Sequence, residues 1–91
     1  MINFKNKKIL ITGATGGIGG ELIKKFVSLQ GNVLATGTKL EKLEILKKNH
    51  PTIKTKQFNI SEHSKIEEFV ESVFKELDGL DILINLSLIH I

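Results

Sequence analysis

The sequence predicts an α/β fold in which a doubly wound parallel sheet carries helices on both faces. Three observations support this prediction: a short apolar run precedes a glycine cluster, an amphipathic helical segment follows the cluster, and apolar runs then alternate with helical segments along the chain. Alternating strands and helices imply parallel strands joined by right-handed crossovers. The expected succession is β-α-β-α-β-α-β, and the expected strand order is 3-2-1-4.

The first unit is a strand, a glycine turn and a helix. Residues 9–11 (Ile-Leu-Ile) predict a buried strand, and glycines crowd residues 13–20 directly after it. A helix to about Leu29 would place five apolar side chains on one face: Ile18, Leu22, Ile23, Phe26 and Val27. Gly31 is expected to end this helix in a left-handed conformation. This is the layout of a dinucleotide-binding unit, in which the backbone approaches the pyrophosphate and the helix N-terminus holds its charge.

The second unit begins with a short apolar strand at residues 32–36, which reads as buried on both faces. Thr38 and Glu41 have the spacing of a capping box at the start of a helix. The inner stripe of that helix would consist of Leu40, Leu43 and Leu46. Residues 53–59 alternate as a third strand, with Phe58 as its largest apolar residue.

The third helix has the clearest periodicity in the sequence. Its apolar positions are Ile66, Phe69, Val70, Val73, Phe74 and Leu77. Ser64 and Glu67 are spaced as a capping box before it, and Asp78-Gly79 closes it. Residues 81–85 are expected to form the fourth strand. The glycine turn then lies at the switch point between the first and fourth strands, as in a Rossmann-like fold.

Composition narrows the function classes. Ninety-one residues make at most one small domain. The net charge is +3, but the lysines are dispersed and arginine is absent, so nucleic-acid binding is not expected. The absence of cysteine excludes disulfides and thiol catalysis. The histidines lack metal-ligand spacing: His50, His63 and His90. The N-terminus does not resemble a signal peptide, so a cytoplasmic protein without membrane contact is expected.

Three motifs together resemble the short-chain dehydrogenase/reductase (SDR) family. The glycine turn has the spacing T-G-x-x-x-G-x-G, with Thr12, Gly13, Gly17 and Gly19 at the defined positions. Residues 81–85 (D-I-L-I-N) are similar to the start of the family's D-I-L-V-N-N-A-G segment, and residues 58–61 (F-N-I-S) to its motif after the third strand. The turn also fits T-G-x-x-G-x-x-G through Gly16, the form of the epimerase-like branch, and this alternative stays open.

The resemblance implies which residues bind a dinucleotide. Those assigned to its pyrophosphate and ribose side are Gly13, Thr15, Gly16, Gly17, Ile18 and Gly19. Asn59 and Ile60 would flank the adenine, and Asn85 would lie near a ribose. Structural alternatives remain: Asn59 as a residue of the turn after a strand, and Asn85 as a buried amide with its hydrogen bonds satisfied.

The end of the second strand predicts NADP rather than NAD as cofactor. An NAD-preferring protein places a carboxylate here to hold the ribose 2′-hydroxyl. This sequence has Gly37 followed by Thr38 and Lys39, a hydroxyl and an ammonium that would accept a 2′-phosphate. Alternatively, Thr38 acts only as the cap of the second helix and Lys39 only as a solvated residue of its first turn. Gly16 departs from the pattern, because many NADP-binding members have a basic residue there.

The family's catalytic residues are not found in this chain. SDR chemistry requires a Tyr-x-x-x-Lys pair and a serine, whereas the sequence contains no tyrosine and none of its serines matches the family serine. The resemblance implies a parent oxidoreductase, similar to 3-oxoacyl-acyl-carrier-protein reductase and expected to be a homo-oligomer. A non-catalytic dinucleotide-binding protein on the same fold is the alternative. The chain alone is expected to be inactive.

Two segments are expected. Residues 1–85 are interpreted as the N-terminal part of an NAD(P)-binding domain. Residues 86–91 (L-S-L-I-H-I) correspond to the translation of CTG TCT CTT ATA CAC ATC, the start of a transposon-end sequencing adapter. They are therefore expected to be a non-native tail. A natural apolar extension of the fourth strand is the alternative.

Overall fold

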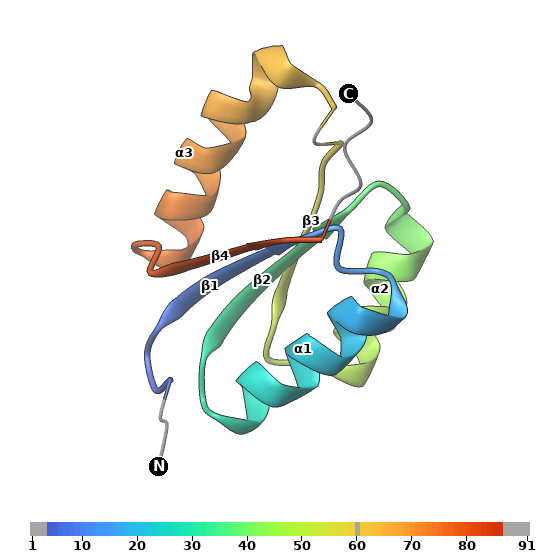
Figure 1. The fold of residues 1–91 in the computed structure, drawn as a ribbon, viewed down its shortest axis with the longest axis vertical. Helices are drawn as coiled ribbons and strands as arrows, with labels where there is room; N and C mark the ends of the chain where they lie inside the picture. The colour runs from blue at the N-terminus through green and yellow to red at the C-terminus, as the bar shows by residue number, and fades with distance from the viewer. Residues whose placement is uncertain (1–3, 60, 87–91) are drawn as a thin grey trace.

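A computed structural model describes residues 4–59 and 61–86 of the chain. The elements are β1 (Lys8–Thr12), α1 (Gly17–Ser28), β2 (Asn32–Gly37), α2 (Leu40–Asn49), β3 (Lys54–Gln57), the 3₁₀ turn η1 (His63–Lys65), α3 (Ile66–Leu77) and β4 (Ile82–Asn85). The strands form one parallel sheet in the order β3-β2-β1-β4 (Figure 1). This confirms the predicted fold class and strand order.

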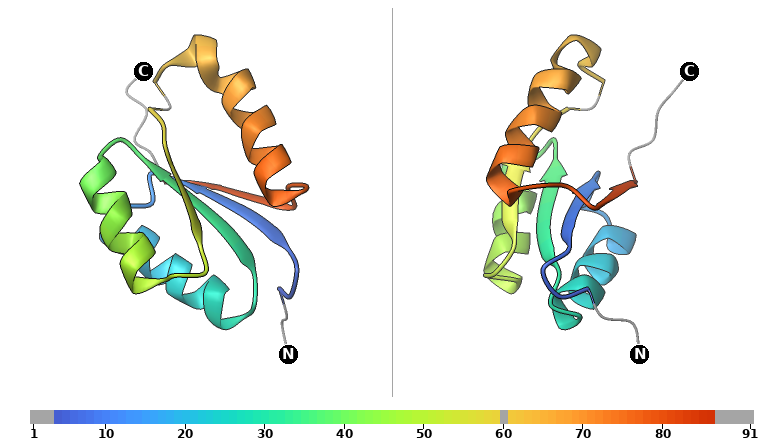
Figure 2. Two further views of the ribbon diagram at one scale, coloured as in Figure 1. Left: turned by 180° about the vertical axis from the view of Figure 1, so that it is seen from behind. Right: turned by 90° about the vertical axis from the view of Figure 1, so that its left-hand side faces the viewer.

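Helices cover both faces of the sheet, and each face has its own apolar core. α1 and α2 lie on one face and α3 lies on the other (Figures 1 and 2). The first core consists of Ile9, Ile11, Ala14, Ile23, Phe26, Val33, Ala35 and Ile53. The second consists of Leu10, Leu34, Phe69, Val73 and Leu77. Successive strand residues point to opposite faces, so β1 and β2 are buried on both sides.

The end of α1 corrects one prediction. Gln30, not Gly31, adopts the left-handed conformation, with φ of 66°. The N–H of Gly31 donates to the carbonyl of Phe26 (2.9 Å) and that of Gln30 to Val27 (3.0 Å), which is a Schellman motif. A Cβ at position 31 would lie 2.7 Å from Cδ1 of Ile9, so a larger residue there would require the Ile9 side chain to shift. Gly31 thus packs closely against β1.

Both predicted capping boxes are wrong. The N-cap of α2 is Lys39, and no side chain caps it among the described residues. Thr38 precedes the helix, and its carbonyl accepts a hydrogen bond from Nε2 of Gln57 on β3 (2.9 Å). Ser64 lies inside the 3₁₀ turn η1, and the N-cap of α3 is Lys65, so the helix begins one residue later than a Ser64 cap requires.

The remaining boundaries follow the predictions closely. Asp78 ends α3 in the left-handed conformation (φ 59°), and Gly79 follows with φ of 129°, which confirms the predicted closure. Asp81 then starts the return to the sheet, because its N–H donates to the Lys8 carbonyl (2.8 Å) while its carboxylate accepts from the Lys8 N–H (2.8 Å). Of the predicted non-native tail at 86–91, only Leu86 lies within the described residues.

Candidate dinucleotide-binding site

The predicted binding residues meet at the carboxyl edge of the sheet, where the strands end. The glycine turn leaves β1 there, and Gly13 takes a left-handed φ of 66° that permits the sharp turn. The N–H of Ala14 donates to the carbonyl of Thr36 (2.9 Å), which holds the turn against β2. The turn therefore lies over the end of the neighbouring strand as well as its own.

Two kinds of glycine occupy this turn. Gly19 is buried under the turn, and a Cβ on it would fall 2.6 Å from the carbonyl carbon of Ala14. Gly16 and Gly17 are exposed, and a Cβ on either would meet no atom within 4 Å. Gly19 thus lets α1 pack onto the turn, whereas Gly16 and Gly17 leave open space above the start of the helix.

The first turn of α1 is suited to an anion. Gly16 is its N-cap, and within the described part of the chain neither a capping side chain nor a first-turn acid competes for its N–H groups. Such N–H groups carry partial positive charge at a helix N-terminus. Together with the open space over Gly16 and Gly17, this fits the pyrophosphate of a dinucleotide.

Ile18 corrects the predicted inner face of α1. The side chain is 71% exposed, while Ile23 and Phe26 of the same helix are buried. Ile18 therefore belongs to the surface beside the glycine turn and not to the core. That position agrees with its alternative assignment as a residue facing the dinucleotide. Leu40 departs similarly from the predicted stripe of α2, being 51% exposed, whereas Leu43 is buried.

The end of β2 lies directly beside the glycine turn. Gly37 is buried, and a Cβ at this position would come 2.8 Å from Cγ2 of Thr15. Thr38 and Lys39 follow immediately and are both exposed. The structure thus brings Thr15 together with the β2–α2 connection, which carries the hydroxyl and ammonium groups predicted to select the cofactor.

A pocket of about 500 Å³ opens between the ends of β2 and β3. It is lined by Thr38, Gln57, Phe58, Asn59, Glu62 and Lys65. Gln57, Glu62 and Lys65 are not among the predicted site residues. The Lys65 ammonium lies 3.5 Å from the Glu62 carboxylate, on an exposed surface. The sequence gives no signal for Gln57, because the predicted third strand runs to residue 59. The structure ends β3 at Gln57 and pairs it with Gly37 of β2.

Asn59 turns the chain at the mouth of this pocket. Its Oδ1 accepts a hydrogen bond from the Ser61 N–H (3.0 Å) and another from the Ser61 hydroxyl (2.7 Å). This is an Asx-type turn, the structural alternative for Asn59. The same residue also lines the pocket and is exposed, so the turn leaves it available to a ligand. Ile60, the other predicted adenine neighbour, lies outside the described residues.

Asn85 ends β4 opposite Thr12, the last residue of β1. The Thr12 hydroxyl donates to Oδ1 of Asn85 (2.7 Å). Asn85 is exposed, so the alternative of a buried amide is wrong. Thr12, itself 4% exposed, therefore holds the Asn85 side chain at the carboxyl edge beside the glycine turn.

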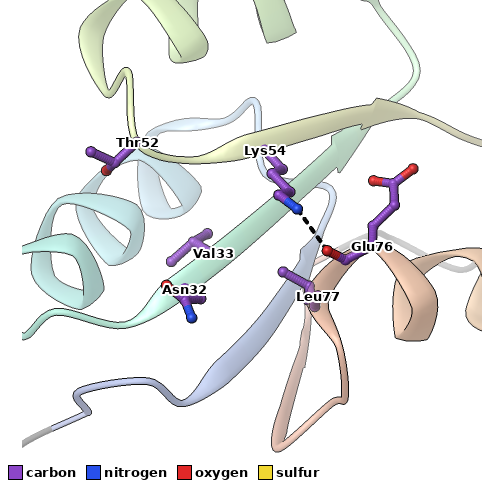
Figure 3. Close-up of a pocket in the computed structure, with 6 residues that line it drawn as sticks. All are labelled: Asn32, Val33, Thr52, Lys54, Glu76 and Leu77. Atoms are coloured by element: carbon purple, nitrogen blue, oxygen red, sulfur yellow. Dashed lines mark hydrogen bonds between the residues drawn. The ribbon is translucent and has the colours of Figure 1, made fainter.

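Another pocket, of about 220 Å³, lies at the opposite edge of the sheet, where β2 and β3 begin (Figure 3). Lys54 points across it toward the end of α3, and its ammonium donates to the Glu76 carbonyl (2.6 Å). The last carbonyls of a helix favour such a cation. This pocket therefore belongs to the attachment of α3 to the sheet, remote from the glycine turn.

Two further kinds of feature are absent from the described residues. No group of three or more His, Cys, Asp or Glu residues there could hold a metal ion. None of the helices described is long and apolar enough to cross a membrane.

The chain is similar to proteins of one family. The short chain dehydrogenase family model matches residues 7–87. An uncharacterized oxidoreductase, DltE, of Bacillus subtilis (strain 168) is 36% identical over 80 residues, which cover 88% of this chain and 32% of DltE. The NADP-dependent 3-hydroxy acid dehydrogenase YdfG of Salmonella typhi is 33% identical over 78 residues, covering 85% of this chain and 32% of YdfG.

Solved structures agree with these sequence relatives. A short chain dehydrogenase from Bacillus anthracis superposes with a TM-score of 0.83 at 29% sequence identity, covering 94% of this chain and 36% of that protein. A short-chain dehydrogenase/reductase from Brucella melitensis gives a TM-score of 0.80 at 27% identity, with 90% and 36% covered. The chain spans about a third of the length of the curated relatives it matches.

Proposed function

The chain belongs to the short-chain dehydrogenase family, and from that premise we propose that it is the N-terminal, cofactor-binding part of an NADP-dependent oxidoreductase. The single observation that carries this proposal is the open glycine turn at the carboxyl edge of the sheet. The space above Gly16 and Gly17 and the uncapped start of α1 fit a pyrophosphate. When bound, the nicotinamide would supply the hydride that reduces a carbonyl in the complete protein.

The preference for NADP is proposed from the end of β2. Thr38 and Lys39 are exposed beside the pocket, and the last strand residue is Gly37, so this connection carries no carboxylate. A ribose held at the end of β2 would direct its 2′-phosphate to this place. The hydroxyl of Thr38 and the ammonium of Lys39 would bind that phosphate. Adenine would enter the pocket between Thr38 and Asn59.

The catalytic residues are proposed to lie outside this chain. The family resemblance requires a tyrosine as general acid, and the sequence contains none. The 91-residue chain is therefore expected to bind a dinucleotide without reducing a ketone. A 3-oxoacyl group on acyl-carrier protein is proposed as the parent's substrate, from the resemblance of the N-terminal M-x-N-F-x-x-K and A-T-G-T segments to that class of reductase.

The introduction of a carboxylate at position 38 tests the cofactor preference. Thr38→Asp would weaken NADP binding about tenfold or more, because like charges near a protein surface repel by about 1–4 kcal/mol at contact distance. Binding of NAD would be unchanged or stronger. Thr38 is preferable to Gly37 as the site of the change, since a Cβ at Gly37 meets the Thr15 methyl group at 2.8 Å. Isothermal titration calorimetry with NADP and NAD measures both affinities.

The matched control is Thr52→Asp, which adds the same charge at the opposite edge of the sheet. It should leave the ratio of the two affinities unchanged. An unmodified chain that binds NAD as tightly as NADP would contradict the proposed preference. A chain that binds neither would contradict the proposed function itself.

A further inference from the structure

Asn59 belongs to the pocket proposed to hold the purine base, and its side-chain oxygen already accepts two hydrogen bonds. It lines the pocket between the β2 and β3 ends together with Thr38. Its Oδ1 accepts from both the N–H and the hydroxyl of Ser61, at 3.0 and 2.7 Å. A carbonyl oxygen has two lone pairs, so these two hydrogen bonds use its accepting capacity. The backbone N–H of Ser61 is always a donor, which fixes the oxygen on that side.

The remaining atom, Nδ2, is a donor with two hydrogens. An asparagine that reads adenine specifically uses both amide atoms, donating to N7 and accepting from the N6 amino group. Here the acceptor half of that pair is occupied by Ser61. The amide can therefore donate to a ring nitrogen, but it has no lone pair left for the N6 amino group.

We infer that Asn59 makes this site tolerant of 6-oxopurines: the pocket accepts a dinucleotide with hypoxanthine in place of adenine nearly as well as the adenine form. The inference rests on the proposed dinucleotide site and adds the specificity of its base pocket. A 6-oxopurine presents acceptors at both N7 and O6. Both suit the Nδ2 donor, whereas adenine gains nothing from its amino group.

The same geometry predicts how specificity for adenine would be introduced. In Asn59→Asp, one carboxylate oxygen would keep the two hydrogen bonds from Ser61, because an aspartate forms the same turn. The other oxygen would replace Nδ2 and accept from the N6 amino group. At the N7 and O6 edge of a 6-oxopurine, that oxygen would meet only acceptors. The substitution should therefore exclude hypoxanthine without disturbing the turn.

Calorimetry with NADP⁺ and its hypoxanthine analogue tests the inference on the 91-residue chain. The unmodified chain should bind the two within about threefold. Asn59→Asp should favour the adenine form by about tenfold, the size expected when one ligand gains a hydrogen bond to a charged acceptor and the other does not. In ¹⁵N-labelled protein, both ligands should shift the Asn59 side-chain amide resonances. This NMR readout is independent of any enzymatic activity.

Gln57→Glu is the matched control, because it makes the same amide-to-carboxylate change in the same pocket without touching Ser61. It should weaken both ligands equally and leave their ratio unchanged. A tenfold adenine preference in the unmodified chain, or an Asn59→Asp ratio equal to the unmodified one, overturns the inference while the dinucleotide site stands. Failure of the unmodified chain to bind either ligand overturns the proposed function, and this inference with it.

Discussion

At the scale of single residues, the glycines of the turn have two roles: Gly19 packs closely against the backbone of the turn, whereas Gly16 and Gly17 leave open space above the start of α1. Gly19 lies under Ala14, and a Cβ there would come 2.7 Å from the Ala14 Cα. Backbone atoms cannot rotate away as a side chain can, so relief requires α1 or the turn to shift. Gly20, its neighbour in the same helix, has no atom within 4 Å of where a Cβ would lie.

Gly19→Ala is therefore predicted to destabilise the chain by on the order of 1–3 kcal/mol, the cost of overpacking a close contact. Gly20→Ala should be neutral or stabilise by up to about 1 kcal/mol, because alanine has the higher helix propensity. Urea unfolding followed by circular dichroism compares the two variants. Equal midpoints would contradict the packing role assigned to Gly19.

Much of the site is predictable from residue types, and the rest depends on contacts across the sheet. The glycine turn and Thr38 are predicted because their meaning is local: a turn, an open helix start and a missing carboxylate. Gln57 is not, because its role is to hold the Thr38 carbonyl from the adjacent strand. Asn85 is predicted at the carboxyl end of its strand, where the structure has it. Its hydrogen bond to Thr12 joins residues 73 positions apart in the sequence and depends on the pairing of β1 with β4.

At the scale of elements, α3 is attached to the sheet by apolar packing and by lysines of the edge strand. Phe69 is 6% exposed and stacks on Phe58 with ring centroids 4.0 Å apart. Lys56 pairs with Glu76 (3.0 Å), and Lys54 donates to the Glu76 carbonyl. The ion pair is partly exposed and contributes about 0–1 kcal/mol, so the aromatic pair dominates.

Phe69→Ala should accordingly cost about 3–5 kcal/mol of unfolding free energy, the usual range for a buried phenylalanine. Phe74→Ala on the same helix removes a side chain that is 56% exposed and should change stability by no more than about 0.5 kcal/mol. Chemical denaturation of both variants provides the measurement. A Phe74→Ala variant as unstable as Phe69→Ala would show that the two faces of α3 were assigned incorrectly.

Periodicity predicts the α-helices and strands, whereas caps and outer positions require the tertiary structure. The buried stripe of α3 follows from spacing, but Phe74 and Val70 have the same spacing and lie exposed at 56% and 39%. When many apolar side chains lie along one face of a helix, their spacing alone does not show which of them will be buried against the sheet. Likewise, Thr38 is suited to an N-cap by residue type, but Lys39 is the N-cap, and the Thr38 carbonyl accepts a hydrogen bond from β3.

At the scale of the whole molecule, the two edge strands of the sheet, β3 and β4, differ in character. β3 carries lysines, and charged side chains on an edge strand discourage pairing with another chain. β4 is the other edge of the sheet, and its sequence is Ile-Leu-Ile-Asn. Leu83 at its centre is 59% exposed, and no charged residue interrupts the strand. An apolar edge strand of this kind is a template for strand pairing.

We therefore predict that the 91-residue chain self-associates through β4. Leu83→Lys should shift it toward monomer, because two lysines brought together by paired edges repel and the apolar edge is interrupted.

The matched control is Ile45→Lys, since Ile45 is also 59% exposed but lies on α2, which packs on the sheet beside β2 and β3. Both substitutions raise the net charge equally, so general charge repulsion would affect them alike. Sedimentation velocity across a concentration series should show association for the unmodified chain and Ile45→Lys only. A monomeric unmodified chain at every concentration would refute the prediction, and equal loss of association in both variants would assign it to charge instead of the β4 edge.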